Sequence, residues 1–165
     1  MATNMFIKLG DIEGECEDAA HVGWIEITSW SHGFSQPSTP VRASSGATVE
    51  KANHTDLAFT KYLDKATDAI LSTCWTGKQL PTSVLECYRA DGDAVPVKYL
   101  QIDMEKVIIS SYSIGHGGMG DHPAENVSLS YGKVTYTYLD QKKADAQAGA
   151  AKPVSHDLIL NTVEG

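Results

Sequence analysis

Apolar and small polar residues alternate most regularly over residues 124–139, AENVSLSYGKVTYTYL. A period of two residues is typical of a β-strand with one buried and one solvated face. The parity of the apolar positions changes midway, because Leu129 and Val134 are five residues apart. A bulge or bend near Tyr131 and Gly132 would keep both apolar sets on one side. The pattern therefore predicts one long, bent strand, which suits the wall of a small β-barrel.

Most of the remaining chain also has strand character. Segments rich in β-branched and aromatic residues predict strands over residues 4–9, 24–34, 57–62, 82–89, 95–103, 105–114, 125–140 and 154–163. The sequence ADGDA at 90–94 predicts a hairpin turn between two of them.

One segment predicts a helix. Thr67 and Asp68 offer an N-cap and a first-turn carboxylate, Ile70 and Cys74 follow at helical spacing, and Gly77 marks the end. We expect this short helix to flank the sheets.

Two stretches lack periodicity. Residues 35–53 form a segment that is unusually long for a loop in a compact domain, so we expect either an extended functional arm or a plain surface loop. Residues 142–152, KKADAQAGAAK, have few large apolar side chains and predict a flexible linker.

Length and composition fit one domain over residues 1–165. A chain of 165 residues with 42% hydrophobic content can bury one sizeable core. The predicted fold is mainly β: a small β-barrel with one short α-helix and a long extended loop.

Charge and terminal sequence exclude several classes of partner. A formal net charge of -8 argues against nucleic-acid binding, which depends on Lys and Arg contacts to phosphates. The first residues, MATNMFIKLGDIEGE, contain no basic segment followed by an apolar run, and no stretch approaches the roughly 20 apolar residues that span a bilayer. We expect no cleavable export signal and no membrane insertion.

The sequence also contains little that indicates catalysis or a cofactor. Cys16, Cys74 and Cys87 are odd in number and far apart, which predicts neither a disulfide framework nor a zinc site. The glycines of GHGGMG at 115–120 fit a dinucleotide-binding spacing, but a strand rather than a helix is predicted after them. His116, Asp121 and His122 share one loop and could gather a divalent metal, but polar residues on a loop are more often simply solvated. His21, His32, His54 and His156 show no partner pattern, so we expect no catalytic, cofactor-binding or metal-binding residues.

Four segments resemble the haemolysin-coregulated protein family, whose members form the inner tube of the bacterial type VI secretion system. They are GWIEITSWSHGFSQP at 23–37, FTKYLDKATDAIL at 59–71, KVIISSYSIG at 106–115 and PAENVSLSYGKVTYTYLDQ at 123–141. The two ends of the chain are similar as well, so the resemblance covers nearly the whole sequence in order.

The resemblance implies a role in assembly rather than in catalysis. It implies a small β-barrel of two packed antiparallel sheets with one short flanking α-helix. It also implies six copies that close into a ring, rings that stack into a tube, and a lumen that carries and protects effector proteins. The implied partners are further copies of the chain, the spike and sheath proteins of the secretion system, and effectors. The implied route is assembly in the bacterial cytoplasm and export by the type VI system.

Two groups of residues become candidates in that setting. Ser29 and Ser31 share one parity of a strand and are small enough to line a lumen without crowding cargo, with plain packing as the alternative. The arm supplies candidates for contacts between subunits or rings: Gln36, Pro37, Pro40, Val41, Arg42 and Val49.

Two other functions remain open from the residues alone. A monomeric β-barrel could bind a small ligand in its interior. A hydrolase is the third possibility, although the sequence shows no G-x-S-x-G motif and no convergent acid, base and nucleophile.

Overall fold

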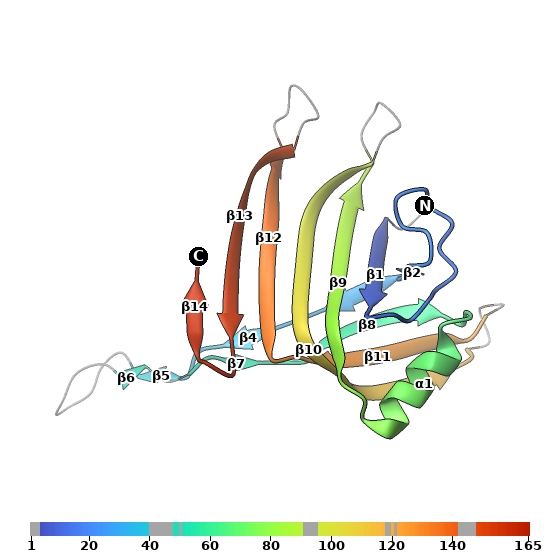
Figure 1. The fold of residues 1–165 in the computed structure, drawn as a ribbon, viewed down its shortest axis with the longest axis horizontal. Coiled ribbons are helices and arrows are strands. Elements are labelled where there is room, and N and C mark those ends of the chain that lie inside the picture. Colours follow the sequence, from blue (N-terminus) through green and yellow to red (C-terminus); the bar gives the residue numbers. More distant parts are fainter. Residues whose placement is uncertain are drawn as a thin grey trace.

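The computed structural model describes residues 4–39, 48–49, 51–90, 96–117, 120, 122–141 and 148–165, and it is mainly β with one short helix (Figure 1). In chain order the elements are β1 (Met5–Leu9), β2 (Ile25–Glu26), β3 (Ser29–Ser31), β4 (Phe34–Ser35), β5 (Ser38–Thr39), β6 (Thr48–Val49), β7 (Asn53–His54), β8 (Leu57–Tyr62), α1 (Thr67–Thr76), β9 (Leu80–Arg89), β10 (Val97–Gly115), β11 (Ala124–Ser130), β12 (Lys133–Gln141), β13 (Ala148–Asp157) and β14 (Thr162–Glu164).

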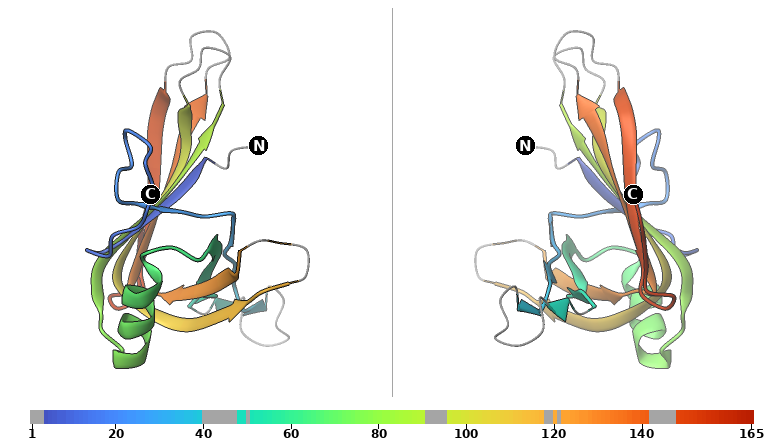
Figure 2. Two further views of the ribbon diagram at one scale, coloured as in Figure 1. Left: turned by 90° about the vertical axis from the view of Figure 1, so that its right-hand side faces the viewer. Right: turned by 90° about the vertical axis from the view of Figure 1, so that its left-hand side faces the viewer.

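The strands form two layers that share β10. The large sheet runs β14-β13-β12-β10-β9-β1-β2, and the small sheet runs β10-β11-β8-β3, with antiparallel pairing throughout. In Figure 1 the yellow β10 descends in the large sheet and then turns into the small one. Figure 2 shows the two layers meeting at a steep angle along this turn.

At this turn β10 bends from the large sheet into the small sheet and exchanges its partner β12 for β11. β10 pairs with β12 up to Glu105↔Lys133, and it pairs with β11 from Ile108↔Ser130 onward. At the corner Lys106 has a positive φ of 55°, and the Gly132 amide donates to the Glu105 carbonyl at 2.9 Å. The bend predicted near residues 131–132 is therefore confirmed, but the single long strand predicted over residues 125–140 is wrong, because β11 and β12 are separate strands that pair with different halves of β10.

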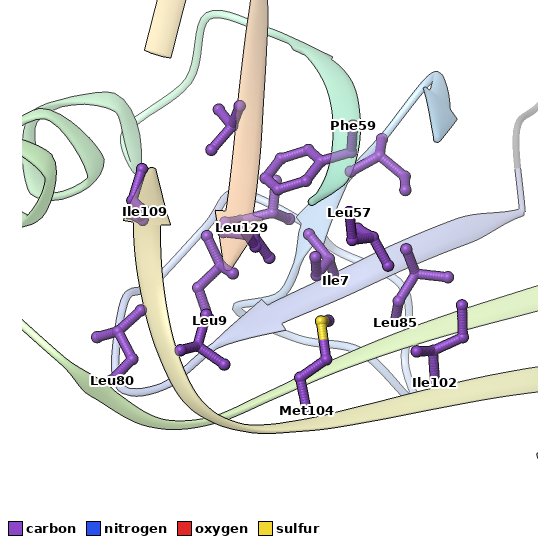
Figure 3. Packing of buried hydrophobic residues seen from close by; sticks show 14 of the residues in the cluster. Ile7, Leu9, Leu57, Phe59, Leu80, Leu85, Ile102, Met104, Ile109 and Leu129 are labelled. Atoms are coloured by element: carbon purple, nitrogen blue, oxygen red, sulfur yellow. The ribbon is translucent and has the colours of Figure 1, made fainter. Parts of the chain in front are cut away.

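The core fills the space between the two layers. Its members are fully or nearly fully buried, as Ile7, Phe59 and Leu85 illustrate (Figure 3). The mainly β fold with packed sheets and one helix is confirmed, but the word barrel is wrong, because the sheets do not close on each other. Open strand edges remain at β14, β2 and β3 within the described part of the chain.

Several predicted boundaries need correction. Residues 24–34 do not form one strand, because the chain crosses between the sheets at residues 27–28 and divides it into β2, β3 and β4. The two strands predicted over 95–114 are one, β10. The predicted linker at 142–152 is wrong for residues 148–152, which belong to β13 and pair with β12.

The helix lies where the sequence predicts it, but its first turn differs. Gly77 ends α1 with a left-handed φ of 67°, as expected from its lack of a side chain. The N-cap is Ala66 rather than Thr67. The Thr67 hydroxyl instead donates to Glu125 at 2.7 Å, because a buried carboxylate lies directly opposite it.

Candidate assembly and cargo surfaces

The outer face of the small sheet is covered by small side chains without charge. One row of directly paired residues crosses the sheet from Ser31 on β3 through Ala58 on β8 and Ser128 on β11 to Ser111 on β10. A second row runs parallel to it: Ser29, Thr60, Asn126 and Ser113. We call these eight residues the serine-rich face. They are exposed or half-buried, and the Thr60 hydroxyl donates to Asn126 Oδ1 at 2.8 Å.

The charged residues of the same strands point the other way. Lys61 on β8 and Glu125 on β11 are directly paired, fully buried, and joined by a salt bridge. Asp64 lies 2.8 Å from the Lys61 ammonium, and the hydroxyl of Tyr112 donates to Glu125 at 2.6 Å. Burial and the Glu125 carboxylate raise the pKa of Tyr112. The alternation of the strands thus leaves the outer face neutral.

The predicted arm is a narrow ribbon where the structure describes it. β4 pairs with β7 and β5 pairs with β6, so the segment projects from the body as two antiparallel strands (Figure 1). The expectation of an irregular segment over 35–53 is therefore wrong for these strands. Gln36 and Pro37 lie between β4 and β5, and Val49 lies in β6. Pro40, Val41 and Arg42 are outside the described residues.

The border formed by β13 and β14 is apolar and exposed. Leu160 and Val163 are 71% and 69% exposed, and Ile159 and Val154 are also among the exposed large hydrophobic residues. β14 has hydrogen-bond pairing to β13 on one side only. An open strand edge beside exposed apolar side chains is a typical place for another chain to bind.

Three histidines that looked unrelated in the sequence meet at the base of the arm. His32 Nδ1 lies 2.5 Å from the Tyr136 hydroxyl, and His32 Nε2 lies 2.6 Å from the Tyr131 hydroxyl. The same Tyr131 oxygen is 2.7 Å from His54 Nδ1, and His54 Nε2 is 2.8 Å from His156 Nδ1. We call these five residues the histidine–tyrosine chain.

Burial changes the acid–base properties of the chain. Desolvation, and secondly the neighbouring His54, lower the pKa of His32 to about 4. Desolvation, His156 and Lys51 lower the pKa of His54. Burial also raises the pKa of Tyr136 to about 12. At neutral pH these groups are therefore uncharged.

Sequence reasoning missed this cluster because its members are far apart along the chain. His32 and Tyr136 are separated by 104 residues, and His54 and His156 by 102. The pairing of β4 with β7 and of β12 with β13 places them in two groups, and the packing of the arm base against the large sheet brings the two groups together. The sequence indicates only that Tyr136 shares the parity of the buried Val134 and so faces the same side of β12.

The remaining chemical candidates gather no site. Gly115 ends β10 and the chain returns in β11, so the glycine-rich loop joins two strands rather than preceding a helix. Among the residues that the structure describes, no three His, Cys, Asp or Glu side chains could hold a metal ion, and Cys16, Cys74 and Cys87 are free thiols.

The described helix is too short and too polar to cross a bilayer.

Comparison with known proteins gives a consistent result. Residues 6–138 match the family model described as type VI secretion system effector, Hcp. Protein hcp1 of Pseudomonas aeruginosa is 40% identical over 149 residues, which are 90% of this chain and 91% of that protein. A solved structure of a type six secretion system protein superimposes with a TM-score of 0.89 at 30% identity, covering 99% of this chain and all of that one.

A second solved structure agrees. Hcp1 from Salmonella typhimurium superimposes with a TM-score of 0.81 at 28% identity, over 99% of this chain and all of that one. The model match spans most of the chain, and the Pseudomonas relative is similar along nearly its full length. This chain therefore belongs to the Hcp family of type VI secretion proteins.

Proposed function

We propose that this protein is the structural subunit of the inner tube of a type VI secretion system, in which six copies close into a ring and rings stack. The observation that carries the proposal is the open apolar border at β13 and β14. A ring forms when one heterologous contact repeats until it closes, and such a contact uses two different borders of each subunit. The open edges of β2 and β3, far from β14 along the sheet path, supply candidates for the second border.

A matched pair of variants tests ring formation. Leu160→Asp places a charge in the apolar border, whereas Trp75→Asp places one on α1, which forms none of the three open edges; the two side chains are 71% and 79% exposed. We expect wild type and Trp75→Asp to sediment at about six times the mass of one chain and Leu160→Asp to sediment as smaller species. A wild-type protein that remains monomeric at high concentration would refute the proposal.

The serine-rich face is the proposed lining of the lumen. Within the ring, Ser29 and Ser31 would contact effector cargo, and the other six residues would continue the same neutral surface across β8, β11 and β10. Small hydroxyl and amide groups can form hydrogen bonds with cargo without imposing charge selectivity. We therefore expect retention of cargo to depend on shape and hydrogen bonding.

Cargo retention can be measured separately from ring formation. Ser31→Trp should reduce the amount of effector that co-purifies with intact rings, because the indole narrows the neutral face. Ser72→Trp is the control, since Ser72 is exposed on α1, outside the serine-rich face. Equal amounts of effector with both variants would exclude Ser31 from the cargo surface.

The ribbon arm is the proposed contact to a neighbouring subunit or ring, and it includes Gln36, Pro37, Pro40, Val41, Arg42 and Val49. Its support is its projection beyond the two sheets (Figure 1). Deleting residues 38–48 should leave ring-sized particles and shorten or abolish stacked tubes in electron micrographs. Tubes of normal length would reject this role.

The other proposed partners follow from the tube itself. A tube subunit of this kind would meet spike and sheath proteins, would need no cofactor or catalytic residue, and would leave the bacterial cytoplasm through the type VI system. A monomeric ligand-binding barrel is less well supported, because the apolar core occupies the space between the sheets and the sheets are not closed.

A further inference from the structure

The histidine–tyrosine chain connects the arm to the large sheet. His32 lies between β3 and β4, and His54 lies in β7, so both belong to the base of the arm. Tyr136 and His156 belong to β12 and β13, and Tyr131 lies at the corner. Phe34 of β4 packs edge-on against the rings of His32, His54 and Tyr136. Lys51 Nζ also donates to the Leu158 carbonyl at 2.5 Å, so the base of the arm is attached to the large sheet by polar links and by the half-exposed ring of Phe34.

Each internal link of the chain needs one donor and one acceptor. A neutral imidazole offers one N–H donor and one acceptor nitrogen, and a tyrosine hydroxyl can donate once and also accept. With all three histidines neutral, a single direction of donation satisfies every link from His156 through His54, Tyr131 and His32 to Tyr136.

One extra proton can also be accommodated. If His32 is charged, its two nitrogens donate to the oxygens of Tyr131 and Tyr136. The Tyr131 hydroxyl then turns to donate to His54, and His54 donates to His156. If His54 is charged instead, it donates to Tyr131 and His156, and Tyr131 donates to His32. The hydrogen bonds reorient, and no link between residues of the chain is lost.

A second proton cannot be accommodated. When His54 and His156 are both charged, two N–H groups face each other across 2.8 Å. When His32 is charged together with His54 or with His156, both His32 and His54 donate to the oxygen of Tyr131, whose own proton then has no acceptor within the chain. Every doubly charged state therefore leaves at least one donor of the chain without an acceptor, and it adds repulsion between two positive charges.

The neighbouring groups do not remove this conflict. Asp56 favours the charged form of His32, and the backbone of Thr55 does so through a hydrogen bond, but desolvation and His54 outweigh them. Lys51 is also cationic and disfavours a charge on His54. His156 Nε2 reaches Asn161 Oδ1 only at 3.4 Å.

We propose that the histidine–tyrosine chain is an acid-operated latch: uptake of a second proton releases the base of the arm from β12 and β13. Above the ordinary range of histidine titration the latch is closed, and it opens as the pH falls below that range. Its effect on ring stacking rests on the arm's proposed role as a contact, whereas the release of the arm does not.

Amide hydrogen exchange between pH 7.5 and 4.5 on the full-length protein tests the latch. The probes are the Thr55 amide, which donates to the Gly33 carbonyl at 2.9 Å, and the Gly33 amide, which bonds to Thr55 Oγ1 at 2.9 Å. Both bonds lie within the ribbon, and they report its release because a two-stranded ribbon that is not packed against a sheet is only marginally stable in water. After correction for intrinsic exchange, we expect the opening constant to be flat above about pH 6.5 and to rise by about 100-fold per pH unit below it, the slope for uptake of two protons. The Ile27 amide, which is bonded to Met5 far from the latch, should show no such slope.

Two tyrosine variants complete the test. Tyr131→Phe removes the hydroxyl at the centre of the chain and should open the arm at pH 7.5 and flatten the pH dependence to about tenfold per unit or less. Tyr138→Phe changes an exposed tyrosine of β12 and should behave as wild type. A wild-type slope of tenfold per unit or less, or equal exchange in the two variants, would overturn the latch.

Sedimentation of the same samples separates the latch from the assembly proposal. Steep opening in a protein that forms no ring supports the latch and refutes the tube subunit. Rings whose arm amides do not respond to pH support the subunit and refute the latch.

Discussion

Replacing the buried Lys61 on β8 tests how much its ion pair contributes to the stability of the small sheet. Lys61 is fully buried, and its ammonium contacts Glu125, which is also fully buried, and Asp64 at 2.8 Å. In Lys61→Met the Glu125 carboxylate keeps two hydroxyl donors, Thr67 and Tyr112, but loses its positive partner. The side chain of methionine fills most of the vacated volume, so the loss is mainly electrostatic.

The expected cost follows from breaking a buried ion pair on one side. Such changes typically destabilise by about 3–5 kcal/mol, because an uncompensated charge stays buried. The two hydroxyl donors that remain place Lys61→Met near the lower end, at about 3 kcal/mol. A domain of this kind has roughly 5–15 kcal/mol of stability, so the effect is large.

The neighbouring Lys65 provides the matched control. Its ammonium lies 3.4 Å from Glu13, and the two side chains are 56% and 72% exposed. Lys65→Met should therefore cost less than about 0.5 kcal/mol. Urea unfolding followed by tryptophan fluorescence, at one fixed protein concentration, measures both changes on the same scale.

A second substitution separates loss of charge balance from loss of packing. Adding Glu125→Gln to Lys61→Met replaces the lone carboxylate by a neutral amide that still accepts hydrogen bonds, and should recover about 1–2 kcal/mol. Equal destabilisation by Lys61→Met and Lys65→Met would show that the buried pair does not hold the sheet. Failure of the double variant to recover stability would assign the cost to packing.

Two further changes test the core and one close backbone approach. Phe59→Ala should cost about 3–5 kcal/mol in the same urea assay, because the ring is 1% exposed within the core. Tyr62→Ala on the same strand should cost under about 1 kcal/mol, since Tyr62 is 56% exposed. Equal losses of stability would contradict the observed packing. Gly14→Ala should lower stability by at least about 1 kcal/mol, because the added Cβ would collide with the Trp24 carbonyl. At Gly115 an added Cβ meets no atom within 4 Å, so Gly115→Ala should leave stability nearly unchanged. A Gly14→Ala variant as stable as wild type would refute the close contact.

Local pattern predicted those parts of the fold that depend on neighbours in sequence. The bend near Gly132 follows from the change of parity between Leu129 and Val134, and the core burial of both residues confirms it. The end of α1 follows from Gly77. By contrast, the β13 segment from Ala148 is poor in large apolar residues, and it is a strand because β12 pairs with it rather than because of its own propensity.

The candidate surfaces also divide into a part that local pattern predicts and a part that depends on strand pairing. Parity along one strand is enough to place Ser29 and Ser31 on the same face. The other six members of the serine-rich face, and the histidine–tyrosine chain, require the pairing of strands that lie far apart along the sequence. Alternation fixes which side of a strand a residue faces, but it does not fix which strand lies next to it.

The buried ion pair connects this register to the proposed function. Lys61 and Glu125 are direct partners across β8 and β11, on the inner parity shared with Phe59. A slip of one residue on β8 would move Lys61 to the outer face, leave Glu125 buried without its cation, and turn Thr60 into the core. The charges that look misplaced inside the protein thus make the shifted register costly. By this argument, they keep the surface around Ser29 and Ser31 neutral, which is the property that the proposed lumen needs.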